Sequence, residues 1–235
     1  MYLIDSYQTE FDSTVEEIKS DEQGMWVRLE KTLFYPTSGG QPSDRGTLTH
    51  EGIIYTVRDC RKSDGKIFHL LDHPGLSLGS TVHGTIDWAR RYRLMRSHTA
   101  AHIISSVAHQ EYHAQISGNQ LDVDKCRVDF SLEQFDRTLL LGLQQKTNSV
   151  IARDLIVSAT IMAREEAFKI PALVKLEKGL DPTIMEVRVL SIGDFDTQAD
   201  AGTHVHHTLE IKGIEIFDLE NKGKGRKRLY FKLVD

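Results

Sequence analysis

The sequence predicts an α+β protein, in which a small β-barrel domain over residues 1–87 precedes an α+β domain over residues 88–235. Three observations lead to this fold class. The first part holds short β-branched and aromatic runs between turn residues, the second part mixes helical and strand-like patterns, and the chain is 40% hydrophobic and 27% charged. A chain of 235 residues with this composition can bury one sizeable core or two modest ones, and we expect two.

Three strands are expected in the first part. β-branched and aromatic side chains recur in residues 25–29, 53–57 and 81–86, and Gly, Pro, Ser and Asp residues separate these runs. Short strands divided by turns in this way are typical of a small barrel.

Helical and strand-like patterns mix from residue 88 onward. A helix is expected around His98 and His102, and strand-like segments follow as far as Phe130. The remaining expected elements are an amphipathic helix over residues 132–153, strands over 156–162 and 185–192, and a closing hairpin over 209–217 and 228–234.

The two cysteines, Cys60 and Cys126, lie in strand-like segments and lack the C-x-x-C spacing of a metal or redox motif. We expect both to be reduced packing residues. The N-terminus has no signal-peptide pattern, and no run approaches the ~20 apolar residues of a membrane span. The expected location is the cytoplasm.

His98 and His102 are four residues apart in a segment with a helical pattern. Residues i and i+4 share one face of a helix, so the two imidazoles can reach one cation. Such short motifs also recur by accident, as His109 and His113 illustrate. Eleven residues at about 1.5 Å each separate His109 from His98, which is too far for the two to share an ion.

A loop about a hundred residues later offers the second half of a metal site. Asp200 and His204 supply a carboxylate and an imidazole on either side of Gly202, a residue that allows a tight bend. His206 would point the same way as His204 in an extended chain and is a reserve ligand, whereas His207 is the weaker candidate. We predict one zinc ion per chain, bound by His98, His102, Asp200 and His204.

Five blocks of sequence occur in order along almost the whole chain. They are the glycine-rich run 33–48, the histidine pair, Ser117-Gly118-Asn119-Gln120 leading to residues 127–130, the stretch 164–167, and Asp200-Ala201-Gly202-Thr203-His204 followed by residues 222–225. Together they resemble the free-standing alanyl-tRNA editing proteins, in the longer form with a glycine-rich N-terminal domain, and the editing domain of alanyl-tRNA synthetase. Five ordered blocks are far more specific than any one of them.

The chain departs from this family at two positions. Asp200 stands where the family usually has cysteine, and Ala201 where it has glycine. A carboxylate oxygen is an accepted zinc ligand, so three histidines and one aspartate form a reasonable set. Thiolate is the softer ligand, however, and its loss weakens the preference for zinc over harder ions such as Mn²⁺. The exchange bears on metal identity and affinity, and an inactive relative is the alternative that stays open.

The resemblance implies a hydrolase that cleaves the ester joining a wrong amino acid to alanine tRNA, chiefly serine and with glycine as the second candidate. The four metal ligands are its catalytic group. The metal can polarise the ester carbonyl, activate water or anchor the aminoacyl group, and the sequence leaves these roles open. No nucleophile-elbow motif or Ser-His-Asp order suggests an acyl-enzyme, so direct attack by water is favoured. No ATP-site motif is present, and no use of ATP is expected.

Alanine is smaller than serine and cannot be excluded from the site by size. To leave correctly charged alanine tRNA intact, the site must therefore bind the serine hydroxyl through a favourable polar contact. By resemblance, the glycines of the N-terminal block also shape this choice, and the alternative for them is a plain tight turn. The predicted substrate-binding residues are Gly39, Gly40, Thr99, Ser117, Gly118, Asn119 and Gln120.

The net charge of −5 argues against a general nucleic-acid binder, but basic residues gather in two places. Either cluster alone is typical of a solvated face. Together, with one of them adjoining the histidine pair, they predict a rim that contacts tRNA phosphates. The rim residues are Arg90, Arg91, Arg93 and Arg96, and near the C-terminus Lys222, Lys224 and Arg226, followed by Lys227 and Arg228.

Two other classes of function stay open at this point. One is a zinc hydrolase that acts on another aminoacyl-tRNA, and the other is an RNA-binding module with a structural metal. An open coordination position favours an enzyme, whereas a closed site with four protein ligands favours a structural ion.

Overall fold

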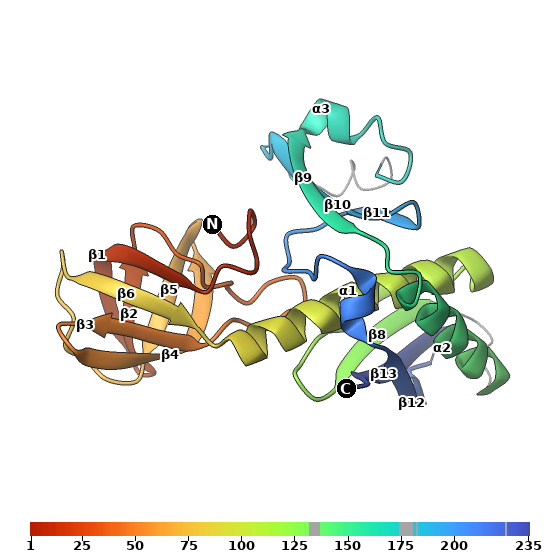
Figure 1. Ribbon diagram of the computed structural model, residues 1–235, viewed down its shortest axis with the longest axis horizontal. Coiled ribbons are helices and arrows are strands. Elements are labelled where there is room, and N and C mark those ends of the chain that lie inside the picture. The colour runs from red at the N-terminus through yellow and green to blue at the C-terminus, as the bar shows by residue number, and fades with distance from the viewer. Residues whose placement is uncertain (132–136, 174–180, 182, 224) are drawn as a thin grey trace. The chain divides into compact units, whose positions relative to one another are not determined.

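The computed structural model describes residues 1–131, 137–173, 181, 183–223 and 225–235 (Figure 1). It confirms the α+β fold class and divides into two compact units. The first comprises Met1–Met95 with Leu121–Val123, and the second comprises Arg96–Gln120 with Asp124–Asp235. The predicted domain boundary between residues 87 and 88 stays a prediction.

The first unit contains a closed antiparallel barrel, which confirms the β-barrel expected from the sequence. The strands follow one another around it in the order β1-β2-β5-β4-β3-β6. The three predicted strands fall on β2, β4 and β6. The bounds are β1 Glu10–Asp21, β2 Gly24–Leu29, β3 Gly46–His50, β4 Ile53–Ser63, β5 Lys66–Leu71 and β6 Thr81–Ile86.

Alternation of buried and exposed side chains explains how β1 fits the barrel. Phe11, Ser13 and Val15 are buried, whereas Glu10 and Asp12 between them are exposed. Successive side chains of a strand point to opposite faces. The acidic residues of this stretch therefore form the outer face of a strand whose inner face belongs to the apolar core.

A fully buried ion pair joins a barrel loop to the first turn of helix α1 (Trp88–Tyr112) within the first unit. The Nε of Arg91 donates to both carboxylate oxygens of Asp44, at 2.9 and 3.0 Å. The same guanidinium donates to the carbonyl oxygens of Ser6 and Leu33, and Asp44 also accepts a hydrogen bond from the backbone N–H of Tyr35. The polar groups of this pair are thus satisfied by the protein itself.

The short segment Leu121–Val123 belongs to the first unit although it follows β7 in sequence. The backbone N–H of Leu121 donates to the carbonyl oxygen of Gly40 at 2.8 Å, and the Arg93 side chain donates to the carbonyl oxygen of Val123. The first unit is therefore built from two separate stretches of chain.

The second unit contains two antiparallel sheets and most of helix α1. Residues 96–108 of the helix are buried without interruption, so their side chains lie in the interior of the protein. One sheet has the order β12-β13-β8-β7 and the other β11-β10-β9. The remaining elements are β7 Gln115–Gln120, β8 Cys126–Ser131, α2 Arg137–Ile151, β9 Val157–Ala163, α3 Arg164–Ala167, β10 Glu186–Ile192, β11 Asp196–Ala199, the 3₁₀ helix η2 Thr208–Ile211, β12 Ile214–Asn221 and β13 Arg226–Leu233.

Most elements expected in the second part are confirmed. Strands β9 and β10 lie where strands were predicted, and β12 and β13 form the closing hairpin. The start of that hairpin was predicted wrongly, because η2 occupies residues 208–211 and β12 begins only at Ile214. Helix α2 lies within the predicted range 132–153, whose first residues, 132–136, are outside the described residues.

Two predictions about the chain as a whole can be compared with the structure. Cys60 in β4 and Cys126 in β8 are both buried thiols, as expected. Among the described residues, no helix is both long enough and apolar enough to cross a membrane.

Candidate metal centre

Helix α1 carries two histidines into the interior of the second unit. His98 and His102 are one turn apart, with ring centroids separated by 5.1 Å, and they are 2% and 8% exposed. A buried imidazole needs polar partners, because leaving a polar group unsatisfied away from water costs free energy.

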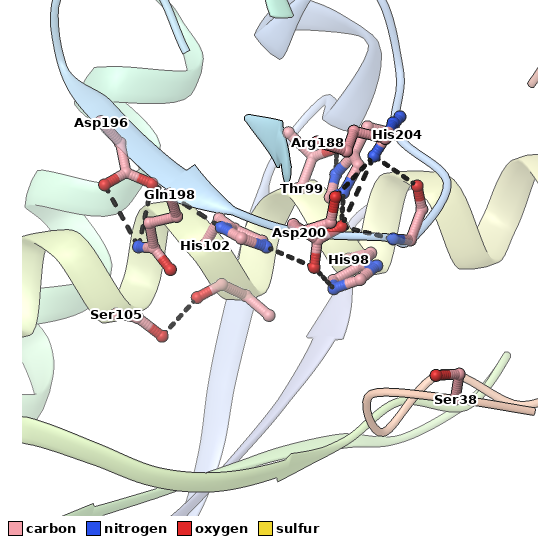
Figure 2. A network of polar contacts seen from close by, with 12 residues as sticks. Ser38, His98, Thr99, His102, Ser105, Arg188, Asp196, Gln198, Asp200 and His204 are labelled. Atoms are coloured by element: carbon pink, nitrogen blue, oxygen red, sulfur yellow. Dashed lines mark hydrogen bonds and ion pairs between the residues drawn. The ribbon is translucent and has the colours of Figure 1, made fainter. Parts of the chain in front are cut away.

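The loop after β11 brings those partners (Figure 2). Arg188 of β10 holds the loop in place, since its guanidinium donates to the carbonyl oxygens of Asp200 and Gly202, both at 3.1 Å. Gly202 packs so closely that a Cβ there would lie 2.1 Å from Cε1 of His98. Only glycine therefore fits between the loop and the helix at this point.

Three imidazoles converge on the Asp200 carboxylate (Figure 2). Nε2 of His204 lies 2.9 Å from its Oδ2, and the Nε2 atoms of His98 and His102 each lie 3.5 Å from its Oδ1. One ligand atom from each of the four residues lies within 4.8 Å of the others. Three imidazole nitrogens and a carboxylate oxygen form a zinc-type donor set. The structure thus brings together the four residues predicted to bind one metal ion.

Burial and charge set the protonation of the cluster. Burial lowers the pKa of His98, and it lowers the pKa of His204 to about 4 although Asp200 opposes it. Burial also acts to lower the pKa of His102, but Asp196 and Asp200 raise it to about 9. For Asp200 burial acts to raise the pKa, and the neighbouring histidines hold it well below its usual range. Asp200 is therefore ionised, and His98 and His204 are neutral, as metal binding requires.

Further polar groups contact the histidines from outside the cluster. The Thr99 hydroxyl lies 3.1 Å from Nδ1 of His204, and a carboxylate oxygen of Asp196 lies 3.7 Å from Nδ1 of His102. The Asp196 carboxylate also accepts hydrogen bonds from the Gln198 amide at 3.2 and 3.1 Å. Outer groups of this kind fix the ring orientation of metal-binding histidines.

Asp196 was not among the residues singled out in the sequence. Asp196 and Gln198 alternate along β11, and Asp200 continues the same alternation directly after the strand. Side chains two residues apart share one face of a strand. Counting back from Asp200 in steps of two residues along the strand would therefore have identified Asp196 from the sequence.

A pocket of about 180 Å³ lies against the cluster, and His98, His102 and Asp200 form part of its lining. Asn119 of β7 and Gln198 of β11 contribute amide groups to the same pocket. A small polar group that enters it meets three of the four candidate ligands directly.

The predicted substrate-binding residues of the second unit occupy different places. Asn119 lines the pocket, whereas Thr99 is fully buried, and its hydroxyl contacts His204 and the backbone N–H of Val205. Thr99 is therefore placed to orient a ligand and is not exposed to a substrate.

The other candidates lie along β7. The hydroxyl of Ser117 donates to the carbonyl oxygen of Asp129, and Ser117 lines a separate pocket. Gly118 pairs with Asp129 across the sheet, and Gln120 is exposed at the end of the strand. Strand β7 thus presents Asn119, rather than Ser117, to the candidate metal centre.

The glycine pair of the first unit forms a tight turn. Gly39 and Gly40 have φ values of 56° and 83°, and backbone hydrogen bonds join Ser38 and Gln41 on either side of them. Positive φ at both central positions is typical of a two-residue hairpin turn and favours glycine. A role of these glycines in substrate choice stays a prediction.

The structure corrects the predicted basic rim. Arg91 is fully buried against Asp44, and Arg96 is 5% exposed and donates to two backbone carbonyl oxygens, so neither guanidinium is available to a phosphate. Arg90 and Arg93 are half-buried and donate to backbone carbonyl oxygens. Of the C-terminal group, Lys222 and Arg226 are exposed, and Lys224 lies outside the described residues.

The other histidines considered as ligands lie outside the cluster. His109 and His113, near the end of α1, are exposed, and so are His206 and His207. The reserve ligand His206 is therefore not part of the candidate site.

Comparison with known proteins gives matches along the chain. A family described as class II (A) tRNA synthetases matches residues 6–90, and one described as the second additional domain of threonyl and alanyl tRNA synthetases matches residues 187–230. The alanyl-tRNA editing protein AlaX-M of Methanosarcina barkeri is 46% identical over 100% of this chain and 98% of its own length. The protein of the same name from Saccharolobus solfataricus is 41% identical over 98% of this chain and 97% of its own length.

An alanine–tRNA ligase is also similar. The ligase of Methanothrix thermoacetophila is 35% identical over 96% of this chain, which corresponds to 24% of the ligase. The similarity therefore spans the full length of the free-standing editing proteins but only a part of the ligase.

Proposed function

The chain belongs to the family of alanyl-tRNA editing proteins, and on this premise we propose that it is a trans-editing hydrolase that removes serine from wrongly charged alanine tRNA. The observation that carries the proposal is the pocket lined by His98, His102 and Asp200. Such a pocket gives an aminoacyl ester access to the candidate ligands, as a catalytic metal requires and a purely structural one does not.

We assign one Zn²⁺ per chain to His98, His102, Asp200 and His204. When bound, the ion supplies a Lewis acid for the ester carbonyl or for the attacking water. The ionised Asp200 provides the negative charge of the donor set, and Arg188 and Thr99 fix the loop and the ring of His204 around it. His102 has to release its proton to become a ligand, so metal binding is linked to pH.

Asn119 supports the choice of serine over alanine and glycine. Among the described residues, its side-chain oxygen is buried and has no hydrogen-bond partner. A serine hydroxyl in the pocket can donate to this oxygen, whereas alanine and glycine leave it unsatisfied. A buried polar group that only the correct substrate satisfies can discriminate by large factors.

Attack by water is favoured over an acyl-enzyme. Ser105 lines the pocket, but its hydroxyl donates to the carbonyl oxygen of Ala101 on the same helix at 2.7 Å. A serine nucleophile needs an adjacent base that accepts its proton. Ser105 instead has the hydrogen bond of an ordinary helical serine.

We further propose that the protein works in the cytoplasm without ATP, and that residues 1–87 and 88–235 are separate domains.

Gly39 and Gly40 are proposed to influence substrate choice. Replacing both glycines by alanine strains the positive φ values of their turn. A changed ratio of seryl to alanyl ester hydrolysis would support a role in selection, and an unchanged ratio in a folded variant would leave only a turn.

The decisive experiment measures deacylation of serine, glycine and alanine esters of alanine tRNA, with and without a chelator. We expect rapid loss of serine, slower loss of glycine, retention of alanine, and arrest of the reaction by the chelator. Hydrolysis of a different aminoacyl-tRNA alone would favour a zinc hydrolase of other specificity. Metal loss that unfolds the protein, with no hydrolysis before it, would favour a structural ion.

A further inference from the structure

A second pocket of about 430 Å³ lies at the sheet β12-β13-β8-β7 and is strongly basic. Four of its lining residues are cations that come from the closing hairpin, and Ser117 of β7 and Asp129 of β8 complete the lining. The cations are Lys222, Arg226, Lys227 and Arg228.

Internal carboxylates balance only part of this charge. Arg228 donates to both oxygens of Asp129, at 2.8 and 2.9 Å, and Lys222 pairs with Glu220. Within the described part of the chain, Arg226 and Lys227 have no carboxylate partner. Lys227 is only 9% exposed, and its ammonium donates to the neutral side-chain oxygen of Asn221 at 3.1 Å. Two uncompensated cations, one of them buried, favour an anionic ligand because a buried charge without a counter-charge is unfavourable.

The guanidinium of Arg228 has capacity for such a ligand. It offers five N–H donors, and Asp129 occupies two of them through a fixed bidentate contact. Planar guanidinium groups beside lysine ammonium groups are the usual binders of phosphate oxygens in proteins.

Edge strand β7 contributes to the lining of both this pocket and the pocket at the candidate metal centre. Asn119 lines the pocket at the metal centre, and Ser117, two residues earlier, lines the basic pocket. Two residues of a strand span about 7 Å. An extended polyanion whose end lies in the pocket at the metal centre can therefore place an earlier phosphate in the basic pocket by passing over strand β7.

We infer that the basic pocket binds a phosphate group of the 3′ strand of the tRNA substrate, near the nucleotide that carries the amino acid. This assignment rests on the proposed editing function. It replaces the predicted rim of two arginine and lysine clusters by one defined pocket. Contacts of this kind set the register of a nucleic acid on a protein without reading its sequence.

The test compares Arg226→Glu with the matched control Lys232→Glu. Both residues are exposed cations on β13, and six residues, or roughly 20 Å, separate them along the strand. Circular dichroism first establishes that each variant is folded. The affinity of each variant for uncharged alanine tRNA is then measured at several salt concentrations. We expect Arg226→Glu to weaken binding roughly tenfold and to reduce the slope of log K against log salt by about 1, with Lys232→Glu within twofold of wild type.

Hydrolysis of two substrates separates this inference from the proposed function. Seryl-tRNA contains the phosphates, and a seryl ester of adenosine contains none. Arg226→Glu should raise KM about tenfold for seryl-tRNA, with kcat retained, and should leave turnover of the adenosine ester unchanged.

Three outcomes would overturn the assignment: equal tRNA affinity of the two variants, an equal loss on both substrates, or absence of tRNA binding by the wild-type chain. Failure of the wild-type chain to hydrolyse either ester would reject the proposed function alone. In that case, the affinities for uncharged tRNA would still test whether the basic pocket binds a tRNA phosphate.

Discussion

Each unit of the molecule buries a cluster of polar side chains, and the two clusters differ in how they are satisfied. In the first unit, the guanidinium of Arg91 meets the Asp44 carboxylate and two backbone carbonyl oxygens. In the second unit, three imidazoles surround the single carboxylate of Asp200, and the Nδ1 of His102 is buried without a hydrogen bond among the described residues.

The difference separates a structural cluster from a candidate metal site. A closed pair of opposite charges needs nothing further, and its removal should affect stability. Three imidazoles and one carboxylate, with their ligand atoms within 4.8 Å of one another, form a set that one cation can bridge. Both clusters are buried and polar, so the distinguishing feature is the number of metal-ligand atoms that face one another.

The largest expected effect is the loss of metal when a candidate ligand is removed. His98→Ala, His102→Ala and His204→Ala should each lower zinc content and seryl-tRNA deacylation by more than about a hundredfold. The reason is that removing an outer partner of a ligand already costs 10–100-fold. Metal analysis and single-turnover hydrolysis measure both quantities. His109→Ala, an exposed histidine of the same helix, is the control and should behave as wild type.

Full metal content with full turnover in any one of the three variants would remove that histidine from the site. The buried cluster of the second unit would then not be a metal site formed by these three histidines.

The closed cluster should respond in stability instead of activity. Arg91→Leu leaves the Asp44 carboxylate buried and unpaired, and we expect the free energy of unfolding to fall by about 3–5 kcal/mol. Arg61→Leu breaks an exposed pair with Asp59 in the same unit and should cost at most about 1 kcal/mol. Urea denaturation measures both, and equal losses would show that the buried pair has no special structural role.

A buried histidine of the barrel should make the stability of the first unit depend on pH. His69 is fully buried, with ring nitrogens 2.9 Å from the Thr32 hydroxyl and 3.0 Å from the Val27 carbonyl oxygen. Burial lowers the pKa of His69 from 6.5 to about 4. Between these values the unfolded chain binds a proton that the folded chain does not, so stability falls as the pH falls from 6.5 to 4. The total loss is about 3 kcal/mol.

Denaturation at several pH values, for the wild type and for His69→Gln, tests this dependence. The wild type should show the loss between pH 6.5 and 4, and the variant should lack that component. An identical pH dependence in both proteins would exclude His69 as its source.

A smaller effect is expected from the outer partner of His102. Asp196→Asn keeps the size of the side chain but removes the carboxylate charge, and zinc affinity should fall 10–100-fold. Competition with a chelator measures this affinity directly. Asp194→Asn changes an exposed carboxylate two residues away, which pairs with Arg153, and should leave zinc affinity unaltered. Equal affinities in the two variants would show that Asp196 does not orient His102.

The smallest expected change concerns metal preference. Asp200→Cys replaces a hard oxygen ligand by a soft thiolate and should shift the ratio of zinc to manganese affinity toward zinc, by about tenfold. Parallel titrations with the two metals give the ratio. An unchanged ratio would indicate that Asp200 does not contact the ion.

Spacing in the sequence was sufficient to predict the candidate ligands. His98 and His102 are separated by one helical turn, and the loop around Gly202 holds the other two ligand types, so local periodicity and residue chemistry identified all four. The barrel could be predicted as a class from its short strands. Strand β1 was not expected, because its exposed acidic residues conceal the buried side chains that alternate with them.

Properties that depend on tertiary packing were less accessible. Arg90, Arg91, Arg93 and Arg96 form one basic run in sequence, but successive helical residues point in different directions, and two of the four point into the interior. Nothing in the run itself shows that Asp44, 47 residues earlier, meets Arg91. Ser117 and Asn119 likewise lie in one short motif and would share a face of a regular strand. A β-bulge between Ile116 and Gly118 interrupts the alternation, and the two side chains line different pockets.

The return of Leu121–Val123 to the first unit has a consequence for dividing the chain. A fragment that ends at residue 95 lacks this segment, so the carbonyl oxygen of Gly40 and the side chain of Arg93 lose the hydrogen-bond partners that the segment supplies. The first unit is therefore complete only when a stretch of chain from beyond residue 120 is present.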